Sequence, residues 1–233
     1  MLISKMEGGL NETSGGKENT KGMALILGVR CNDGVVLASD RIFEVGGTLI
    51  AFEGLTDICD DFLRLLRSAM DRVRGFTSIY EVKLVLEDII GDLSKRYRKQ
   101  LGPEGSIGTL LAGLSRISAG NAVLYYVHPR GYAESLNYRC SGHGADSAHS
   151  IAKFLFDSKG SCQNNAFLAA FFISWVSEDV DMIEGGEPQV AIMKDDTGVE
   201  YLSNDLVRQA SQRARQLKSR LVNDLGLQRY FTD

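Results

Sequence analysis

The chain has 233 residues, of which 44% are hydrophobic and 24% are charged, and its net charge is −4. These values are ordinary for a globular protein, and the length suits one large domain or at most two small ones. The acidic balance excludes a general basic field that would attract nucleic acid or an anionic membrane surface.

The first ordered elements are predicted to be a β-hairpin and a further strand. Residues 1–22 are polar, glycine-rich and without periodicity, so we expect a disordered tail or propeptide-like segment before a single domain over 23–233. From Met23 an apolar run reaches Asn32-Asp33-Gly34, and a second apolar run covers 35–39. Asp-Gly between two such runs is typical of a hairpin. Residues 47–52 are predicted to form the next strand.

Two helices follow the first strands. Thr56 is a plausible N-cap, and the helix that it begins carries apolar residues at helical spacing: Ile58, Phe62, Leu65, Leu66, Ala69 and Val73. A second helix is predicted over about 78–100, where Gly102-Pro103 ends it.

The second half of the chain repeats this alternation of strand groups and helix pairs. Strands are predicted over 107–114, 122–127 and 134–140, and helices over about 145–157 and 164–178. Two further strands over 188–194 and 199–202 precede a last helix, which begins after Ser203-Asn204. Its expected buried face consists of Leu206, Ala210, Ala214, Leu217, Leu221 and Leu225.

Antiparallel strand groups and paired helices indicate an α+β fold in which helix layers cover sheets. No apolar run approaches the about 20 residues of a membrane span, and the amino terminus has no secretory apolar region. The cysteines are Cys31, Cys59, Cys140 and Cys162, with no C-x-x-C pair. We therefore expect a cytoplasmic protein with reduced thiols, without cofactor or metal.

Four patches of sequence resemble the proteasome subunits, and together they span most of residues 24–202. They are GVRCNDGVVLASDR at 28–41, LLAGLSRISAGNAVLYYVHPRGYAES at 110–135, SGHGADSAHSIAKFL at 141–155, and Gly185-Gly186 before PQVAIM. The resemblance implies the N-terminal-nucleophile hydrolase fold, a four-layer αββα sandwich of two antiparallel sheets covered by helices. The β-type subunits fit better than the α-type, because residues 1–22 contain no periodic helical segment.

In that family the first residue of the mature chain is a threonine, serine or cysteine that attacks the peptide carbonyl, with its own α-amino group as the base. A lysine, held by an aspartate, assists, and a backbone N–H in the G-x-G turn stabilises the oxyanion. On this plan Ala24 occupies the nucleophile position, or Met23 if the alignment is shifted by one residue. Lysine is absent between Lys21 and Lys83. Neither expected group is present, which predicts an inactive site.

Three positions of the family's site keep a polar side chain and are candidate relics: Asp40, Asp181 and His143. His143 replaces the usual hydroxyl of the G-x-G turn, and Glu184 replaces the one beside Asp181. Asp40 and His143 have simpler interpretations as well, and for His143 this is a plain turn histidine. An aspartate after a strand commonly caps a turn, and the possible zinc pattern of Cys140, His143 and His149 lacks the four closely spaced ligands of a structural site.

Other segments give no firm functional signal. Residues 102–108 lack the Gly-Lys-Ser/Thr of a phosphate loop and are interpreted as a plain loop. The basic residues of the last helix are interpreted as a solvated face, and they are Arg208, Arg213, Arg215, Lys218 and Arg220.

Three functional hypotheses follow. The first is a non-catalytic, proteasome β-type-like subunit with a structural role in a ring or related assembly, whose partners are other such subunits or copies of itself, and not nucleic acid or a membrane. The second is an active threonine-type or other N-terminal-nucleophile peptidase with an unrecognised nucleophile. The third is a free-standing binding module that reuses the fold.

Overall fold

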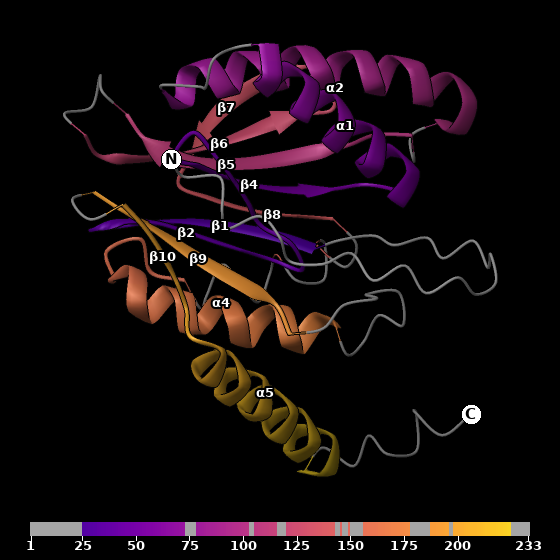
Figure 1. Cartoon of the computed structure of the whole chain (residues 1–233). Coiled ribbons are helices and arrows are strands. Elements are labelled where there is room, and N and C mark those ends of the chain that lie inside the picture. Colours follow the sequence, from indigo (N-terminus) through magenta and orange to yellow (C-terminus); the bar gives the residue numbers. More distant parts are fainter. Residues whose placement is uncertain are drawn as a thin grey trace.

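The structure is a computed structural model that describes residues 25–72, 78–102, 105–115, 120–142, 145, 149, 156–177, 187–195 and 198–224. In these residues two five-stranded sheets lie face to face, and helices cover both outer faces (Figure 1). Every strand pairing is antiparallel. The predicted four-layer αββα sandwich is therefore confirmed.

The first sheet has the strand order β10-β9-β2-β1-β8. Its strands are β1 (Leu25–Cys31), β2 (Gly34–Ser39), β8 (Tyr138–Gly142), β9 (Gln189–Lys194) and β10 (Gly198–Tyr201). The predicted hairpin turn at Asn32-Asp33 joins β1 to β2, which places Cys31 opposite Gly34. Gly34 has φ +151°, and a Cβ there would collide with the carbonyl oxygen of Met193 in β9, so the turn requires glycine.

The second sheet has the strand order β3-β4-β5-β6-β7. Its strands are β3 (Phe43–Val45), β4 (Thr48–Glu53), β5 (Gly108–Leu114), β6 (Ala122–His128) and β7 (Tyr132–Leu136). The sequence predicted β4, β5 and β6 within one or two residues. It missed β3, because a three-residue strand is too short to show an alternating pattern.

Helices α1 (Thr56–Arg72) and α2 (Ile79–Leu101) cover the second sheet, and α4 (Cys162–Ser177) and α5 (Asn204–Asp224) lie on the side of the first (Figure 1). Ser78 caps α2 by accepting a hydrogen bond from the backbone N–H of Glu81. Gly102 ends it with φ +66°, and its N–H donates to the carbonyl of Arg98. The predicted boundaries of these helices agree with the structure to within two residues.

Three separate apolar layers follow from strand alternation, because successive side chains point to opposite faces of a sheet. Leu27 and Val29 of β1 pack toward α4, whereas Ile26 faces the other sheet. A third layer lies between the second sheet and the helices α1 and α2. Gly28 belongs to the middle layer, where a Cβ would lie 2.9 Å from a methyl carbon of Leu124. Glycine at this position lets the two sheets approach closely.

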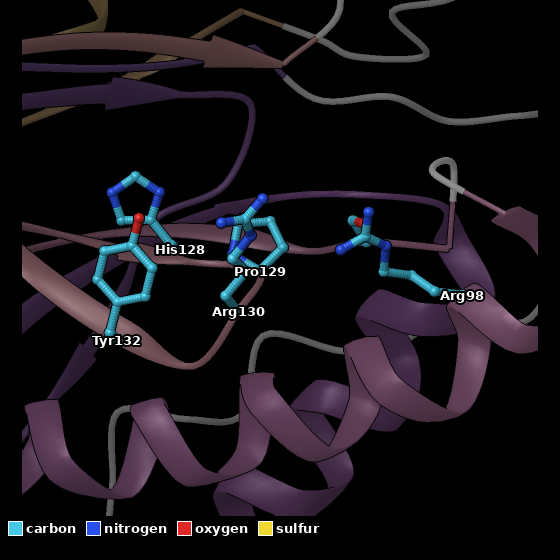
Figure 2. A pocket seen from close by; sticks show the side chains of 6 residues that line it. Arg98, His128, Pro129, Arg130 and Tyr132 are labelled. Atoms are coloured by element: carbon cyan, nitrogen blue, oxygen red, sulfur yellow. The ribbon is translucent and has the colours of Figure 1, made fainter.

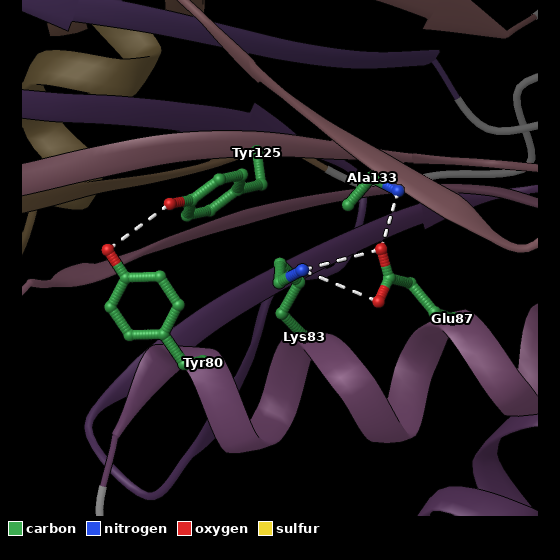
Figure 3. Close-up of polar contacts among 5 residues, drawn as sticks. All are labelled: Tyr80, Lys83, Glu87, Tyr125 and Ala133. Atoms are coloured by element: carbon green, nitrogen blue, oxygen red, sulfur yellow. Dashed lines mark hydrogen bonds and ion pairs between the residues drawn. The ribbon is translucent and has the colours of Figure 1, made fainter.

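Polar contacts hold α2 against the second sheet (Figure 3). The Glu87 carboxylate accepts a 2.7 Å hydrogen bond from the backbone N–H of Ala133 in β7 and pairs with Lys83 at 3.4 Å. Two turns before Glu87, the hydroxyl of Tyr125 in β6 donates to that of Tyr80 over 3.5 Å. These contacts fix the β7 edge of the sheet relative to the helix.

Two details correct the sequence-based prediction. The segment predicted as one strand over 134–140 is two strands, because the chain leaves β7 at Asn137 and crosses to the other sheet as β8. Leu217, predicted to be buried, is 45% exposed. Most of the predicted helix over 145–157 lies outside the described residues, as do the tail over 1–22 and Leu225. Among the helices that the structure describes, none is long and apolar enough to cross a membrane.

Candidate functional site

The beginning of β1 is where the family resemblance places a catalytic residue. There β1 lies beside β8, with Leu25 opposite Gly142 and Ile26 opposite Ser141. Ala24, the predicted nucleophile position, precedes the first described residue. Asp181 and His143 also lie outside the described residues. Of the predicted site positions, the structure therefore describes Asp40 alone.

Asp40 follows β2 directly and is partly exposed. Its Oδ1 atom accepts 2.9 Å hydrogen bonds from the Ser39 hydroxyl and from the backbone N–H of Arg41. The next residue, Ile42, donates its N–H to the side chain of Gln189. These bonds are those of an aspartate that stabilises a turn, so the geometry agrees with the simpler interpretation of this residue.

A group of polar side chains that sequence reasoning missed lies between the two sheets. Glu53 at the end of β4, Tyr126 in β6, and Arg139 and Ser141 in β8 form this inter-sheet polar cluster. Ser141 donates a short hydrogen bond to Oε1 of Glu53, and the Tyr126 hydroxyl donates to the same oxygen over 3.2 Å. The two hydroxyls lie 3.3 Å apart. The cluster joins both sheets beside the beginning of β1.

Arg139 is the fourth member of the cluster, and its guanidinium group lies over the Tyr126 ring. Its guanidinium carbon lies 4.4 Å from the ring centroid, a cation–π distance. Its Nε atom is buried and has no hydrogen-bond partner in the described part of the chain. The Tyr126 ring and the attraction to the Glu53 carboxyl therefore stabilise the positive charge, and no direct ion pair is formed with a carboxylate of the described residues.

Strand register explains how the cluster fits into an apolar layer. Leu49, Ala51 and Glu53 alternate along β4 with outward-facing residues, so Glu53 faces the other sheet. Its neighbour across the ladder is Gly108 of β5. A Cβ on Gly108 would collide with both the Tyr126 hydroxyl and the Glu53 carboxylate. The glycine therefore leaves the space that the carboxyl occupies.

The electrostatics of the cluster favour a neutral carboxyl. Burial raises the pKa of Glu53, and the hydrogen bonds from Ser141 and Tyr126 and the charge of Arg139 oppose that rise only in part. Burial is also the main reason that the pKa of the Tyr126 hydroxyl is raised, with the Glu53 charge adding to it. Both groups hold their protons more strongly than they would in water.

The Glu53 charge acts on two nearby thiols, those of Cys59 and Cys140, and neither thiol is activated. Burial, with the nearby charges of Asp40, Asp60 and Glu53, raises the pKa of Cys59 to about 12. Burial and the Glu53 charge likewise raise the pKa of Cys140 to about 12. Because the thiolate is the nucleophilic form, both cysteines are poor nucleophiles at neutral pH.

Cys31 differs from these two thiols but is the last residue of β1, at the opposite end from Leu25. Hydrogen bonds from Cys162 and Asn165 lower the pKa of Cys31, against the effect of burial. The Asn165 amide nitrogen lies 3.2 Å from its sulfur. This thiol packs in the layer toward α4 and does not face the inter-sheet polar cluster.

The possible zinc ligands are only partly described. Cys140 is buried, and His149 is exposed with its ring centroid 5.6 Å from that of Tyr138. Within the described ranges no group of three or more His, Cys, Asp or Glu side chains is arranged to hold a metal ion.

Two face-to-face antiparallel sheets between helix layers, with the first hairpin in the middle of one sheet, define a proteasome-like N-terminal-nucleophile fold. A solved structure with this fold is Anbu (ancestral beta-subunit) from Yersinia bercovieri, with a TM-score of 0.66 and 14% sequence identity. The match covers 87% of this chain and 96% of that one. No protein-family model and no curated protein matches the sequence. The likeness therefore shows the fold.

Proposed function

We propose that the chain is a non-catalytic, proteasome β-type-like subunit that acts by assembling into a ring or a related oligomer. The observation that carries this proposal is the inter-sheet polar cluster beside the beginning of β1. Reduced cysteines agree with a cytoplasmic location, and the proposed partners are further copies of this chain or related subunits.

The hydrogen bonding of the cluster argues against catalysis. An acyl-transfer site must stabilise negative charge that develops on a carbonyl oxygen. Here the Glu53 carboxyl accepts a hydrogen bond from Ser141, directly before the predicted G-x-G turn. Because the Ser141 hydroxyl is already bonded to this carboxyl, it is not free to stabilise an oxyanion at that turn. Together with Ala24 at the predicted nucleophile position, this arrangement supports an inactive site.

Assembly is supported by apolar side chains that the isolated chain leaves in water. Leu84 and Leu101 of α2 are 57% and 46% exposed. Single exposed leucines are ordinary. Here, however, two of the six exposed large apolar side chains in the described residues lie on one helix. That helix packs beside β7, the last strand of its sheet in the described residues, and an edge strand offers backbone groups to a neighbour.

Native mass measurement together with light scattering tests the assembly. We expect oligomers of defined stoichiometry at micromolar concentration in low salt, no cleavage of a panel of fluorogenic peptides, and an intact mass equal to that of the full chain. A stable monomer under the same conditions would refute the structural role. Processing to a new amino-terminal threonine, serine or cysteine would refute the inactive site.

One observation favours the second hypothesis, that of an unrecognised nucleophile. Ser141 donates a short hydrogen bond to Glu53, and this carboxyl, when ionised, is a base next to a hydroxyl nucleophile. Ser141 is only 9% exposed, which limits access. Labelling by a fluorophosphonate probe that disappears in Ser141→Ala but persists in Ser39→Ala, another buried serine, would favour this hypothesis.

A further inference from the structure

A pocket of about 380 Å³ opens where the β6–β7 turn meets the carboxyl end of α2 (Figure 2). Its lining consists of Arg98, Ser106, His128, Pro129, Arg130 and Tyr132. The volume lies in the range of sites for small molecules. The pocket plays no part in the proposed inactivity of the β1 site.

The backbone around the pocket is fixed by close packing. The β6–β7 turn is closed by a 2.9 Å hydrogen bond from the N–H of Gly131 to the carbonyl of His128. Gly131 has φ +77°, and a Cβ there would lie 2.8 Å from the carbonyl oxygen of Glu87 in α2. The turn therefore rests directly on the helix, and the pocket wall is formed before any ligand arrives.

Two arginines supply positive charge to the pocket. The guanidinium groups of Arg98 and Arg130 have no hydrogen-bond or ion-pair partner within the described part of the chain. Arg96, two residues earlier on α2, does have an ion-pair partner, because its Nη1 atom lies 3.5 Å from Oδ2 of Asp61. In Figure 2 Arg98 and Arg130 extend to the same side of the turn.

An aromatic wall stands beside these charges. The His128 and Tyr132 rings stack with centroids 4.3 Å apart, and the Tyr126 ring contacts His128 edge-on at 4.7 Å. Glu134 is the carboxylate nearest to His128, at 2.8 Å from Nε2, and it is 42% exposed. It does not line the pocket. Positive charge and a flat apolar surface therefore lie side by side.

We propose that this pocket binds a small molecule through a phosphate or carboxylate group. Guanidinium groups bind such oxyanions through paired, charge-assisted hydrogen bonds. The pocket is larger than a bare oxyanion, so the rest of the ligand packs against Pro129 and Tyr132. The chain as a whole is acidic, so the positive charge of this pocket is local and not part of a general basic surface. Anions are therefore attracted to the pocket and not to the protein surface at large.

Isothermal titration of the full chain with inorganic pyrophosphate and with citrate, at low ionic strength, tests the proposal. We expect saturable binding of at least one probe at millimolar concentration, weakened about tenfold or more in Arg98→Gln and in Arg130→Gln. Arg96→Gln is the matched control, since it removes the same charge from the same helix outside the pocket. Tighter binding of pyrophosphate assigns the natural group as phosphate, and tighter binding of citrate assigns it as carboxylate.

Two results would overturn the proposal. One is the absence of saturable binding of both probes to a chain whose circular dichroism shows that it is folded. The other is an equal loss of binding in all three variants, which would show attraction to net charge rather than to this pocket. Neither result bears on the proposed assembly, which native mass tests separately.

Discussion

Replacing Glu53 by glutamine separates the charge of the inter-sheet polar cluster from its hydrogen bonding. Ser141 and Tyr126 both donate to the same atom, Oε1, and the carbonyl oxygen of glutamine accepts hydrogen bonds in the same place. Only the ability to ionise is lost. Alanine instead removes the acceptor altogether, so the two variants probe different properties of one residue.

The expected change in the free energy of unfolding caused by Glu53→Gln follows from proton linkage. The pKa of Glu53 is raised by burial above its ordinary value of 4.5, so between the two pKa values the folded chain holds a proton that the unfolded chain has released. The stability that this proton contributes is complete below the unfolded pKa and is lost as the pH rises through the folded pKa. Each unit of upward shift corresponds to about 1.4 kcal/mol.

We therefore expect Glu53→Gln to match the wild-type chain at acid pH and to exceed its free energy of unfolding at neutral pH. Glu53→Ala has a different expected cost. The hydroxyls of Ser141 and Tyr126 lie 3.3 Å apart and can still bond to each other, so one buried donor is left without a partner. Relative to Glu53→Gln, that costs about 1–3 kcal/mol at every pH, because neither variant can ionise at this position.

Urea unfolding followed by the fluorescence of Trp175, the single tryptophan, measures both effects from about pH 4 to about pH 8. Glu44→Gln is the control, since Glu44 lies exposed on β3 and its replacement should change stability by less than about 0.5 kcal/mol. Parallel pH curves for the wild-type chain and Glu53→Gln would refute the reasoning. Equal stabilities of Glu53→Ala and Glu53→Gln would refute the role of the hydrogen bonds.

Three further predictions concern packing and thiol reactivity. Glu87→Ala removes the acceptor of the Ala133 N–H and should lower the free energy of unfolding by about 1–3 kcal/mol. Backbone hydrogen exchange at β7 should become faster in this variant, and unchanged exchange would contradict the role of Glu87. Gly28→Val overfills the space between the sheets and should cost about 1–3 kcal/mol in urea unfolding, whereas wild-type stability would show that the sheets separate freely. Cys59 and Cys140, whose pKa values are about 12, should alkylate far more slowly in the native than in the urea-unfolded chain, as peptide mapping would show; equal rates would contradict their burial.

Much of the fold could be predicted from local patterns. Asp33-Gly34 between apolar runs located the β1–β2 hairpin, and Gly102 located the end of α2. These signals act within a few residues, where backbone conformation and helix capping depend on the residues themselves. The alternation along β4 also carried a signal for Glu53, because it places that residue on the same face as Leu49 and Ala51.

The sequence by itself determined the order and type of the main elements, since turn residues and apolar periodicity depend on neighbours along the chain. Only the tertiary structure decided that the chain changes sheets at Asn137, and that Glu53 meets Ser141, 88 positions away. It also brought Arg98 beside Arg130 in one pocket. Contacts of this kind depend on how the two sheets pack together and on the space that a glycine such as Gly108 leaves open. Neither property can be predicted from the residues that are neighbours along the chain.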